Sequence, residues 1–98
     1  MLAADFLTRR GAAIVERNRR VGRSEVDLLA RIGNATVVVE VKTVSRTVGG
    51  ITAAAHITPT KLERLRALAR ALGATRIDLL AVTMGEESVE LRWVPGVG

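Results

Sequence analysis

The segment that runs from Glu25 to Lys42, EVDLLARIGNATVVVEVK, constrains the fold more than any other part of this sequence. It predicts two strands joined by a tight turn at Gly33 and Asn34, because glycine at the first central position suits a two-residue hairpin loop. In that register Ile32 faces Ala35, and each residue before the turn has a defined partner after it. The rest of the chain is expected to fold around this hairpin.

The register of the hairpin brings charged side chains together. It places Asp27 opposite Glu40 and Glu25 opposite Lys42. Directly opposed side chains have Cβ atoms about 4.5–5.5 Å apart, and like charges at that separation destabilise the pair unless something compensates. A divalent cation between Asp27 and Glu40 would compensate, so the pattern predicts a metal site.

The strand around Glu40 is apolar on both faces, since it contains Val37, Val38, Val39 and Val41. Such a run is typical of a strand that is covered on both sides. A carboxylate inside it is costly unless it is paired or coordinated.

The cation expected here is Mg²⁺ or Mn²⁺, because these ions accept carboxylate, carbonyl and water oxygens. The candidate metal ligands are the carboxylates of Asp27 and Glu40 and the backbone carbonyl of Val41. Such an ion lowers the pKa of a bound water and neutralises charge on a phosphodiester. Lys42 is the candidate to orient that water or to stabilise the developing negative charge. Glu25 is the candidate to hold Lys42 in place or to bind a second ion, which completes the predicted catalytic set.

Composition narrows the function classes. Residues 1–98 are enough for a single domain with one modest core. The absence of cysteine excludes disulfides and thiolate zinc sites. No apolar run approaches the roughly 20 residues that span a bilayer, and the N-terminus is too charged for a signal peptide, so we expect a cytoplasmic protein with no membrane partner. The net charge of +5 favours a polyanionic partner such as nucleic acid.

The basic residues supply candidate substrate contacts. Lys42 and Lys61 are the only lysines among the 15 basic residues, which suggests positions that need a compact ammonium. On the helix predicted after Pro59, Lys61 falls on the sheet-facing side, where a phosphate or an active-site carboxylate is its expected partner. The remaining candidates for phosphate contact are arginines, and a solvated surface is the alternative for each of them: Arg19, Arg20, Arg23 and Arg46.

The other elements follow from periodicity and from turn residues. An irregular segment after the second hairpin strand is interpreted as a substrate-side flap, and the last four residues are expected to be frayed. Asp78 and Glu90 lie in segments that nearly repeat the motif, and we interpret this as chance similarity between strands. The predicted ranges are a helix at 3–10, a strand at 12–17, a basic connection at 18–23, the flap at 43–57, a helix at 59–72, and strands at 76–83 and 88–94.

At this point the sequence resembles a known family. SEVDLLARIGNATVVVEVKT is similar to the signature of the bacterial YraN-type proteins, in which a Gly-Glu-Ile-Asp-Leu-Ile-Ala segment precedes a Val-Glu-Val-Lys strand. That family is similar to Holliday-junction resolvases and belongs with the restriction-endonuclease-like PD-(D/E)XK nucleases. The likeness also covers Ala3-Ala4, Phe6-Leu7, Gly11, Glu16-Arg17-Asn18, and Lys61 with Leu62 and Leu65.

The resemblance implies a fold, a cofactor and roles. It implies an α/β, three-layer restriction-endonuclease-like core with a mixed sheet of about five strands flanked by helices, and cleavage of DNA with a magnesium-type ion. Asp27, Glu40 and Lys42 take the catalytic triplet, with Glu25 as a motif neighbour. The chain departs from the family where an acidic residue usually precedes the Ala-Ala pair, since Asp5 does not match that place.

Three function classes remain open. The first is a Mg²⁺- or Mn²⁺-dependent DNA endonuclease, selective for branched DNA. The second is a nucleic-acid-binding module that retains the nuclease fold without useful catalysis and binds in a salt-sensitive way. The third is a structural subunit whose exposed hairpin edge pairs with another chain, including a second copy of itself in a homodimer.

Overall fold

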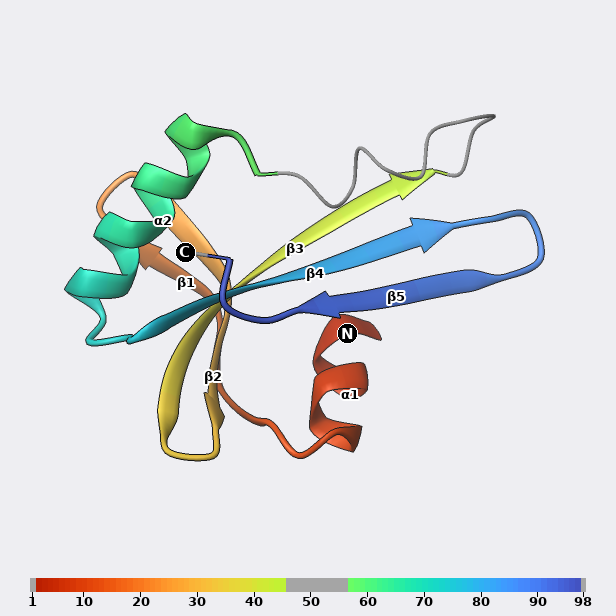
Figure 1. Cartoon of the computed structure of the whole chain (residues 1–98), viewed down its shortest axis with the longest axis horizontal. Helices are drawn as coiled ribbons and strands as arrows, with labels where there is room; N and C mark the ends of the chain where they lie inside the picture. The colour runs from red at the N-terminus through yellow and green to blue at the C-terminus, as the bar shows by residue number, and fades with distance from the viewer. Residues whose placement is uncertain (1, 46–56, 98) are drawn as a thin grey trace.

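The computed structural model describes residues 2–45 and 57–97. These residues form two helices and one mixed sheet, which confirms the expected α/β class and the expected sheet of about five strands (Figure 1). The strands lie side by side in their order along the chain, and β3 and β4 are parallel while every other neighbouring pair is antiparallel. The elements are α1 (Leu2–Arg9), β1 (Ala13–Val21), β2 (Ser24–Ile32), β3 (Ala35–Ser45), α2 (Pro59–Ala71), β4 (Arg76–Met84) and β5 (Val89–Val94).

The helices cover opposite faces of the sheet and give the three-layer core. Val37 and Val39 of β3 are fully buried in the cluster that contains α1. Val38, between them in the sequence, is fully buried in the cluster that contains α2. Since successive side chains of a strand point to opposite faces, β3 is covered on both sides, as its apolar run predicts.

The central hairpin forms in the predicted register. Gly33 has a φ of 60°, which the expected two-residue turn requires and which glycine adopts without strain. Ile32 is paired with Ala35, and the pairing continues to Leu28 with Val39. This register directs Leu28 and Val39 into the core on the α1 side.

Two strands are longer than the sequence predicts. β1 continues through residues 18–21, the region expected to be a basic connection, because those residues pair with the start of β2, for example Arg20 with Glu25. β3 continues past Lys42 because its parallel pairing with β4 extends to Ser45 and Met84. Residues 46–56 of the predicted flap, which include Arg46, lie outside the described residues.

The segment after β5 is bound to the sheet, so the expectation of a frayed end is wrong for residues 95–97. The Val97 N–H donates to the Ile77 carbonyl at 2.9 Å, and the Gly96 N–H donates to the Asp78 side chain at 3.0 Å. Both hydrogen bonds form without a helix or strand in residues 95–97, so a pattern search of this segment does not indicate them. In the described part of the chain, no helix combines the length and the apolar character needed to cross a membrane.

Candidate active site

Asp27 lies where the β2–β3 ladder ends. Its Oδ2 atom accepts a hydrogen bond of 2.9 Å from the backbone N–H of Val41. A side-chain oxygen therefore takes the place of the β2 carbonyl that would continue the ladder. The backbone pairing stops at Leu28 with Val39, so Asp27 and Glu40 are not a ladder pair, which corrects the expected register at its open end.

The same hydrogen bond fixes the direction of the Val41 backbone. In a strand, the N–H and C=O of one residue point to the same neighbouring strand. Because the Val41 N–H points to Asp27, the Val41 carbonyl also faces the β2 side, beyond the end of the ladder. The carbonyl predicted as a metal ligand is therefore directed to the side on which the Asp27 carboxylate lies.

Glu40 carries the electrostatic strain that the sequence predicts. Its side chain is only 13% exposed. Burial raises the pKa of Glu40 above its ordinary value, and the negative charge of Asp27 raises it further, while Lys61 acts in the opposite direction. The two carboxylates are thus close enough to repel each other, although they do not oppose each other in the ladder.

Lys61 reaches this pair from the first turn of α2. Its Nζ atom lies 3.1 Å from Glu40 Oε1. The helix begins as its sequence predicts: the Thr58 hydroxyl accepts from the Lys61 N–H at 3.2 Å, and Pro59 occupies the first helical position. The prediction that Lys61 points to the sheet and meets a carboxylate is confirmed, and that carboxylate is Glu40.

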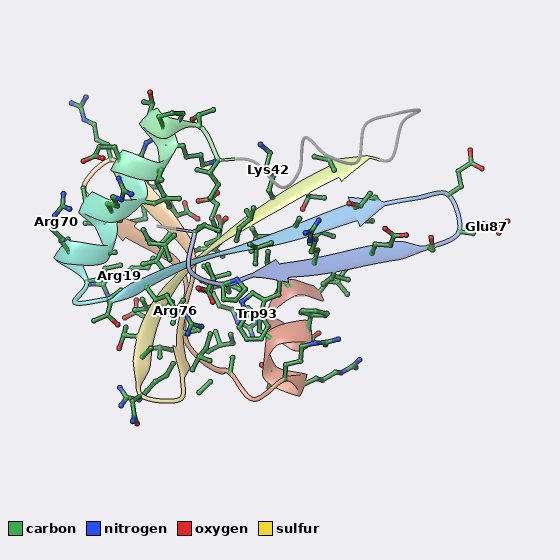
Figure 2. All side chains as sticks on the ribbon, in the orientation of Figure 1. Arg19, Lys42, Arg70, Arg76, Glu87 and Trp93 are labelled. Carbon is green, nitrogen blue, oxygen red and sulfur yellow. The ribbon has the colours of Figure 1, made fainter. Side chains whose placement is uncertain are left out.

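Lys42 lies two residues after Glu40 on β3, so both side chains leave the same face of the strand. Figure 2 shows the Lys42 side chain projecting from β3 with its terminal nitrogen away from the sheet. In the described part of the chain Lys42 makes no ion pair, and it is half-buried. Lys42 therefore shares a strand face with Glu40 without forming an ion pair with it.

The other predicted site residues do not join this cluster. Glu25 is exposed and is paired across the sheet with Arg20 of β1. Arg19 is exposed and forms an ion pair of 2.7 Å with Glu16. Arg23, in the β1–β2 turn, is exposed as well. Within the described residues these arginines form a basic end of the β1–β2 hairpin, separate from the carboxylates.

The protein groups that the site offers to a metal are two carboxylates and one carbonyl. Among the described residues, no group of three or more His, Asp or Glu side chains gathers that could hold an ion. Asp5, the acidic residue of α1, lines a small surface pocket with Phe6 and Leu91 instead. The donors of Asp27, Glu40 and Val41 are all oxygens, which fits Mg²⁺ or Mn²⁺ with the remaining positions taken by water.

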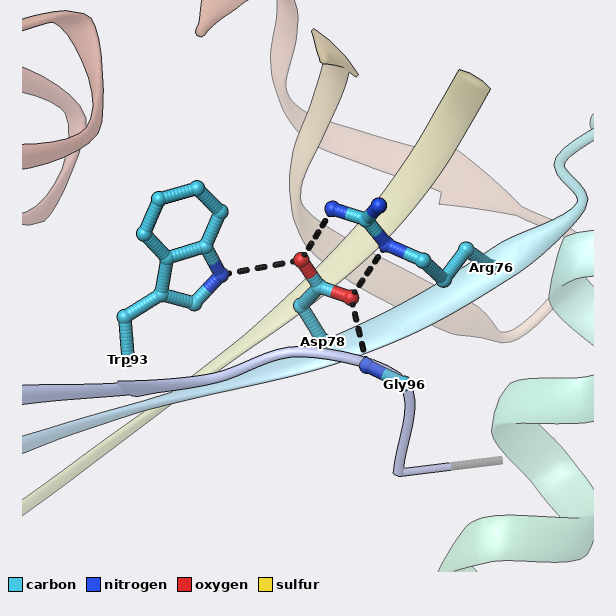
Figure 3. A network of polar contacts seen from close by, with 4 residues as sticks. All are labelled: Arg76, Asp78, Trp93 and Gly96. Atoms are coloured by element: carbon cyan, nitrogen blue, oxygen red, sulfur yellow. Dashed lines mark hydrogen bonds and ion pairs between the residues drawn. The ribbon is translucent and has the colours of Figure 1, made fainter. Parts of the chain in front are cut away.

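A second buried carboxylate, Asp78, has a structural role that the sequence did not reveal. Its oxygens accept hydrogen bonds of 2.9 Å from Arg76 Nε, Arg76 Nη2 and Trp93 Nε1, and one of 3.0 Å from the Gly96 N–H (Figure 3). Asp78 is fully buried. Its acceptors are occupied by protein donors, which agrees with the interpretation that the repeated motif is not a second site. The available signal was an aspartate inside an apolar strand, which requires a buried partner.

The chain is similar to proteins that carry only a family number. The model of "Uncharacterised protein family UPF0102" matches residues 1–82. A UPF0102 protein of Mycolicibacterium vanbaalenii is 38% identical over 106 residues, covering 98% of this chain and 86% of that protein. Another from Streptomyces coelicolor is 44% identical over 94 residues, with coverages of 85% and 71%. A third from Methylococcus capsulatus is 36% identical, with coverages of 93% and 79%.

Among solved structures, the crystal structure of SSO0001 is similar with a TM-score of 0.45 and 15% identity. The match covers 97% of this chain and 48% of the other, so this chain spans about half the length of that protein.

Proposed function

Since the chain belongs to the UPF0102 family, whose fold is restriction-endonuclease-like, we propose that it is a metal-dependent DNA endonuclease selective for branched DNA. The observation that carries the proposal is the arrangement at the end of the β2–β3 ladder. There Asp27 accepts a hydrogen bond from the Val41 N–H, and Glu40 precedes Val41 on β3. Lys61 pairs with Glu40, and Lys42 lies on the same face of β3 as Glu40.

The cluster fits a hard divalent cation. Burial is the main cause of the raised pKa of Glu40, and the negative charge of Asp27 adds to it, while Lys61 acts in the opposite direction. A divalent cation would relieve that repulsion, and the Asp27 carboxylate and the Val41 carbonyl would complete an oxygen ligand set with water. When bound, the ion would supply a water of lowered pKa and neutralise charge on a phosphodiester oxygen.

The two lysines have distinct roles in this proposal. Lys42 makes no ion pair among the described residues, so its ammonium is available to stabilise negative charge that develops on the phosphate. Lys61 is held 3.1 Å from Glu40, and it orients that carboxylate and contacts a substrate phosphate. Thr58 and Pro59 fix the start of α2, which keeps Lys61 in place.

A second candidate function is a nucleic-acid-binding module without useful catalysis. The observation in its favour is basic surface away from the carboxylates. Arg70 is exposed near the C-terminal end of α2, and Arg20 and Arg23 are exposed on the β1–β2 hairpin. This candidate requires neither a divalent ion nor Lys42.

The deciding experiment is cleavage of a four-way junction by purified protein during Mg²⁺ and Mn²⁺ titration. The proposal predicts ion-dependent cleavage that is lost in Asp27→Asn, in Glu40→Gln and in Lys42→Ala, while each variant stays folded. Glu63→Gln is the matched control, because Glu63 is an exposed carboxylate on α2 whose partner is Arg66.

The outcome also separates the two candidates. If contaminant-free protein cuts neither branched, single-stranded nor duplex DNA with either ion, the nuclease proposal fails. Salt-sensitive binding without cleavage would then support the binding module. Calorimetric titration of Mn²⁺ gives a readout besides activity, and the proposal expects binding to weaken in Asp27→Asn but not in Glu63→Gln.

A further inference from the structure

Strand β5 is an edge of the sheet, and it has no β-bulge against its neighbour β4. Edge strands are normally blunted by bulges, by charge or by cover, because their unpaired backbone groups can recruit another strand. β1, at the opposite edge, has a bulge between Ile14 and Glu16 and several arginines. β5 pairs with β4 along its whole length, from Val89 to Val94, without any break in register.

Exposed apolar side chains lie at both ends of this edge. Four large hydrophobic residues are exposed among the described residues, and three of them lie here: Leu2, Met84 and Val89, with 50%, 42% and 40% exposure. Met84 is paired with Val89 at the far end of the β4–β5 hairpin, and Leu2 lines a pocket that includes Leu91. Figure 1 shows the N-terminal end of α1 next to β5 and the hairpin extending away from α2.

The hydrogen bonds decide which residues of β5 offer free backbone groups. Gly85 N–H donates to the Ser88 carbonyl at 2.8 Å, and Val97 N–H donates to the Ile77 carbonyl at 2.9 Å. Odd-numbered residues of β4 therefore direct their backbone groups to β5, and the pairing gives them even-numbered partners such as Arg92. The N–H and C=O groups of Val89, Leu91 and Trp93 consequently face outward.

This parity limits how β5 can pair with a second copy of itself. In an antiparallel pair, the residues that exchange backbone hydrogen bonds must be the odd-numbered ones on both strands, because only these have outward backbone groups. A two-fold axis then lies at one residue, which faces the same residue of the other copy. An axis at residue 90 opposes Glu90 to its own copy, and an axis at residue 92 opposes Arg92 to its own copy. An axis at Leu91 opposes Glu90 to Arg92 twice, and it pairs Val89 with Trp93 twice. Opposite charges stabilise such cross-strand pairs and like charges destabilise them.

We propose that two copies of the chain associate through antiparallel pairing of their β5 strands about an axis at Leu91, which joins their sheets into one. The outward backbone groups of Val89, Leu91 and Trp93 form the ladder. The Glu90–Arg92 pairs set the register on one face, and Val89 of each copy packs against Trp93 of the other copy on the opposite face. This proposal does not depend on nuclease activity.

Introduced cysteines test the register, because the natural chain has none. Residue 91 would oppose its own copy with Cα atoms about 5.5 Å apart, within the roughly 4.4–6.8 Å range of disulfides. Leu91→Cys should therefore form a covalent dimer under mild oxidation. Val89→Cys is the matched control, since its own copy would lie about 13 Å away along the strand. Equal crosslinking of both variants, or none in either, would overturn the proposed register.

A charge exchange tests the association itself by sedimentation equilibrium from micromolar to millimolar protein. Glu90→Arg and Arg92→Glu each create like-charge pairs in a homodimer, so the dissociation constant of each should rise by about tenfold or more. An equimolar mixture of the two variants should form a heterodimer, and the double variant should recover the wild-type constant. A wild-type chain that is monomeric throughout, or single variants that dimerise as wild type does, would refute the proposal. Circular dichroism confirms that each variant is folded.

Discussion

Replacement of Asp78 by asparagine should destabilise the fold strongly, although Asp78 lies outside the candidate site. Each Asp78 oxygen accepts two hydrogen bonds, with donors from Arg76, Trp93 and Gly96. Asparagine retains one acceptor oxygen and puts an NH₂ donor in place of the other. In either orientation of the amide, two of the four donors lose their acceptor. Arg76 donates to both oxygens, so one of its two hydrogen bonds is lost in either orientation. These bonds raise the pKa of Arg76 in the wild-type protein.

The magnitude follows from burial. Asp78 is fully buried, and hydrogen bonds to a charged acceptor are worth roughly 1.5–3 kcal/mol each. Breaking a buried ion pair by changing one partner costs about 3–5 kcal/mol. Because the Arg76 side chain is 32% exposed and can recover some hydration, we expect a loss near the lower end, about 3 kcal/mol. At about 4–8 °C per kcal/mol for a domain of this size, the melting temperature should fall by roughly 12 °C or more.

Urea denaturation followed by the emission of Trp93, the only tryptophan, measures this loss. The matched control is Glu16→Gln, which removes the exposed Arg19–Glu16 ion pair and should change the free energy of unfolding by no more than about 1 kcal/mol. A loss below about 1 kcal/mol for Asp78→Asn, equal to that of the control, would contradict the reasoning, because it would mean that the four hydrogen bonds contribute nothing beyond hydration.

Three further predictions concern the site and the basic surface. Because the folded pKa of Glu40 lies above its unfolded value, the contribution of Glu40 to stability should fall as pH rises from about 4.5 through that raised pKa. Glu40→Gln should therefore gain stability relative to wild type over this window, which urea denaturation at several pH values measures. Lys61→Met removes the charge that lowers the pKa of Glu40, so the Glu40 carboxyl should titrate at a higher pH in an NMR titration; an unchanged midpoint would exclude the ion pair in solution. If Arg19, Arg20 and Arg23 contact duplex phosphates, their triple alanine variant should reduce the slope of log binding constant against log salt by about 0.9 per lost contact, and an unchanged slope would exclude them.

Local rules in the sequence were sufficient for the hairpin and for the position of Lys61. Gly33 needs a positive φ at a two-residue turn, and that requirement alone sets the register from Ile32 to Leu28. The start of α2 depends on Thr58 and Pro59, and the helical period then points Lys61 at the sheet. Each of these inferences uses residues that are neighbours in sequence.

The remaining features depend on contacts that the sequence does not display. The ladder ends at Asp27 because its carboxylate, and not a backbone carbonyl, accepts the hydrogen bond of the Val41 N–H. A register deduced from the turn considers only backbone hydrogen bonds and therefore does not predict this end. The arginine-rich end of β1 resembles a loop in composition, and only its pairing with β2 makes it a strand. The bonds that hold Gly96 require Asp78, which is 18 residues away in the chain.

The parallel contact between β3 and β4 has a consequence for how the protein folds. Every residue pair in it, such as Val37 with Arg76, joins positions 39 residues apart, whereas the antiparallel pairs of the sheet form within hairpins. Closing a long loop before its contacts form is slow relative to hairpin formation. We therefore expect the β1–β2–β3 and β4–β5 units to form first and their docking to limit the folding rate. Glu40 lies in β3 and Lys61 in the segment that crosses to β4, so their ion pair should be completed only in that final step.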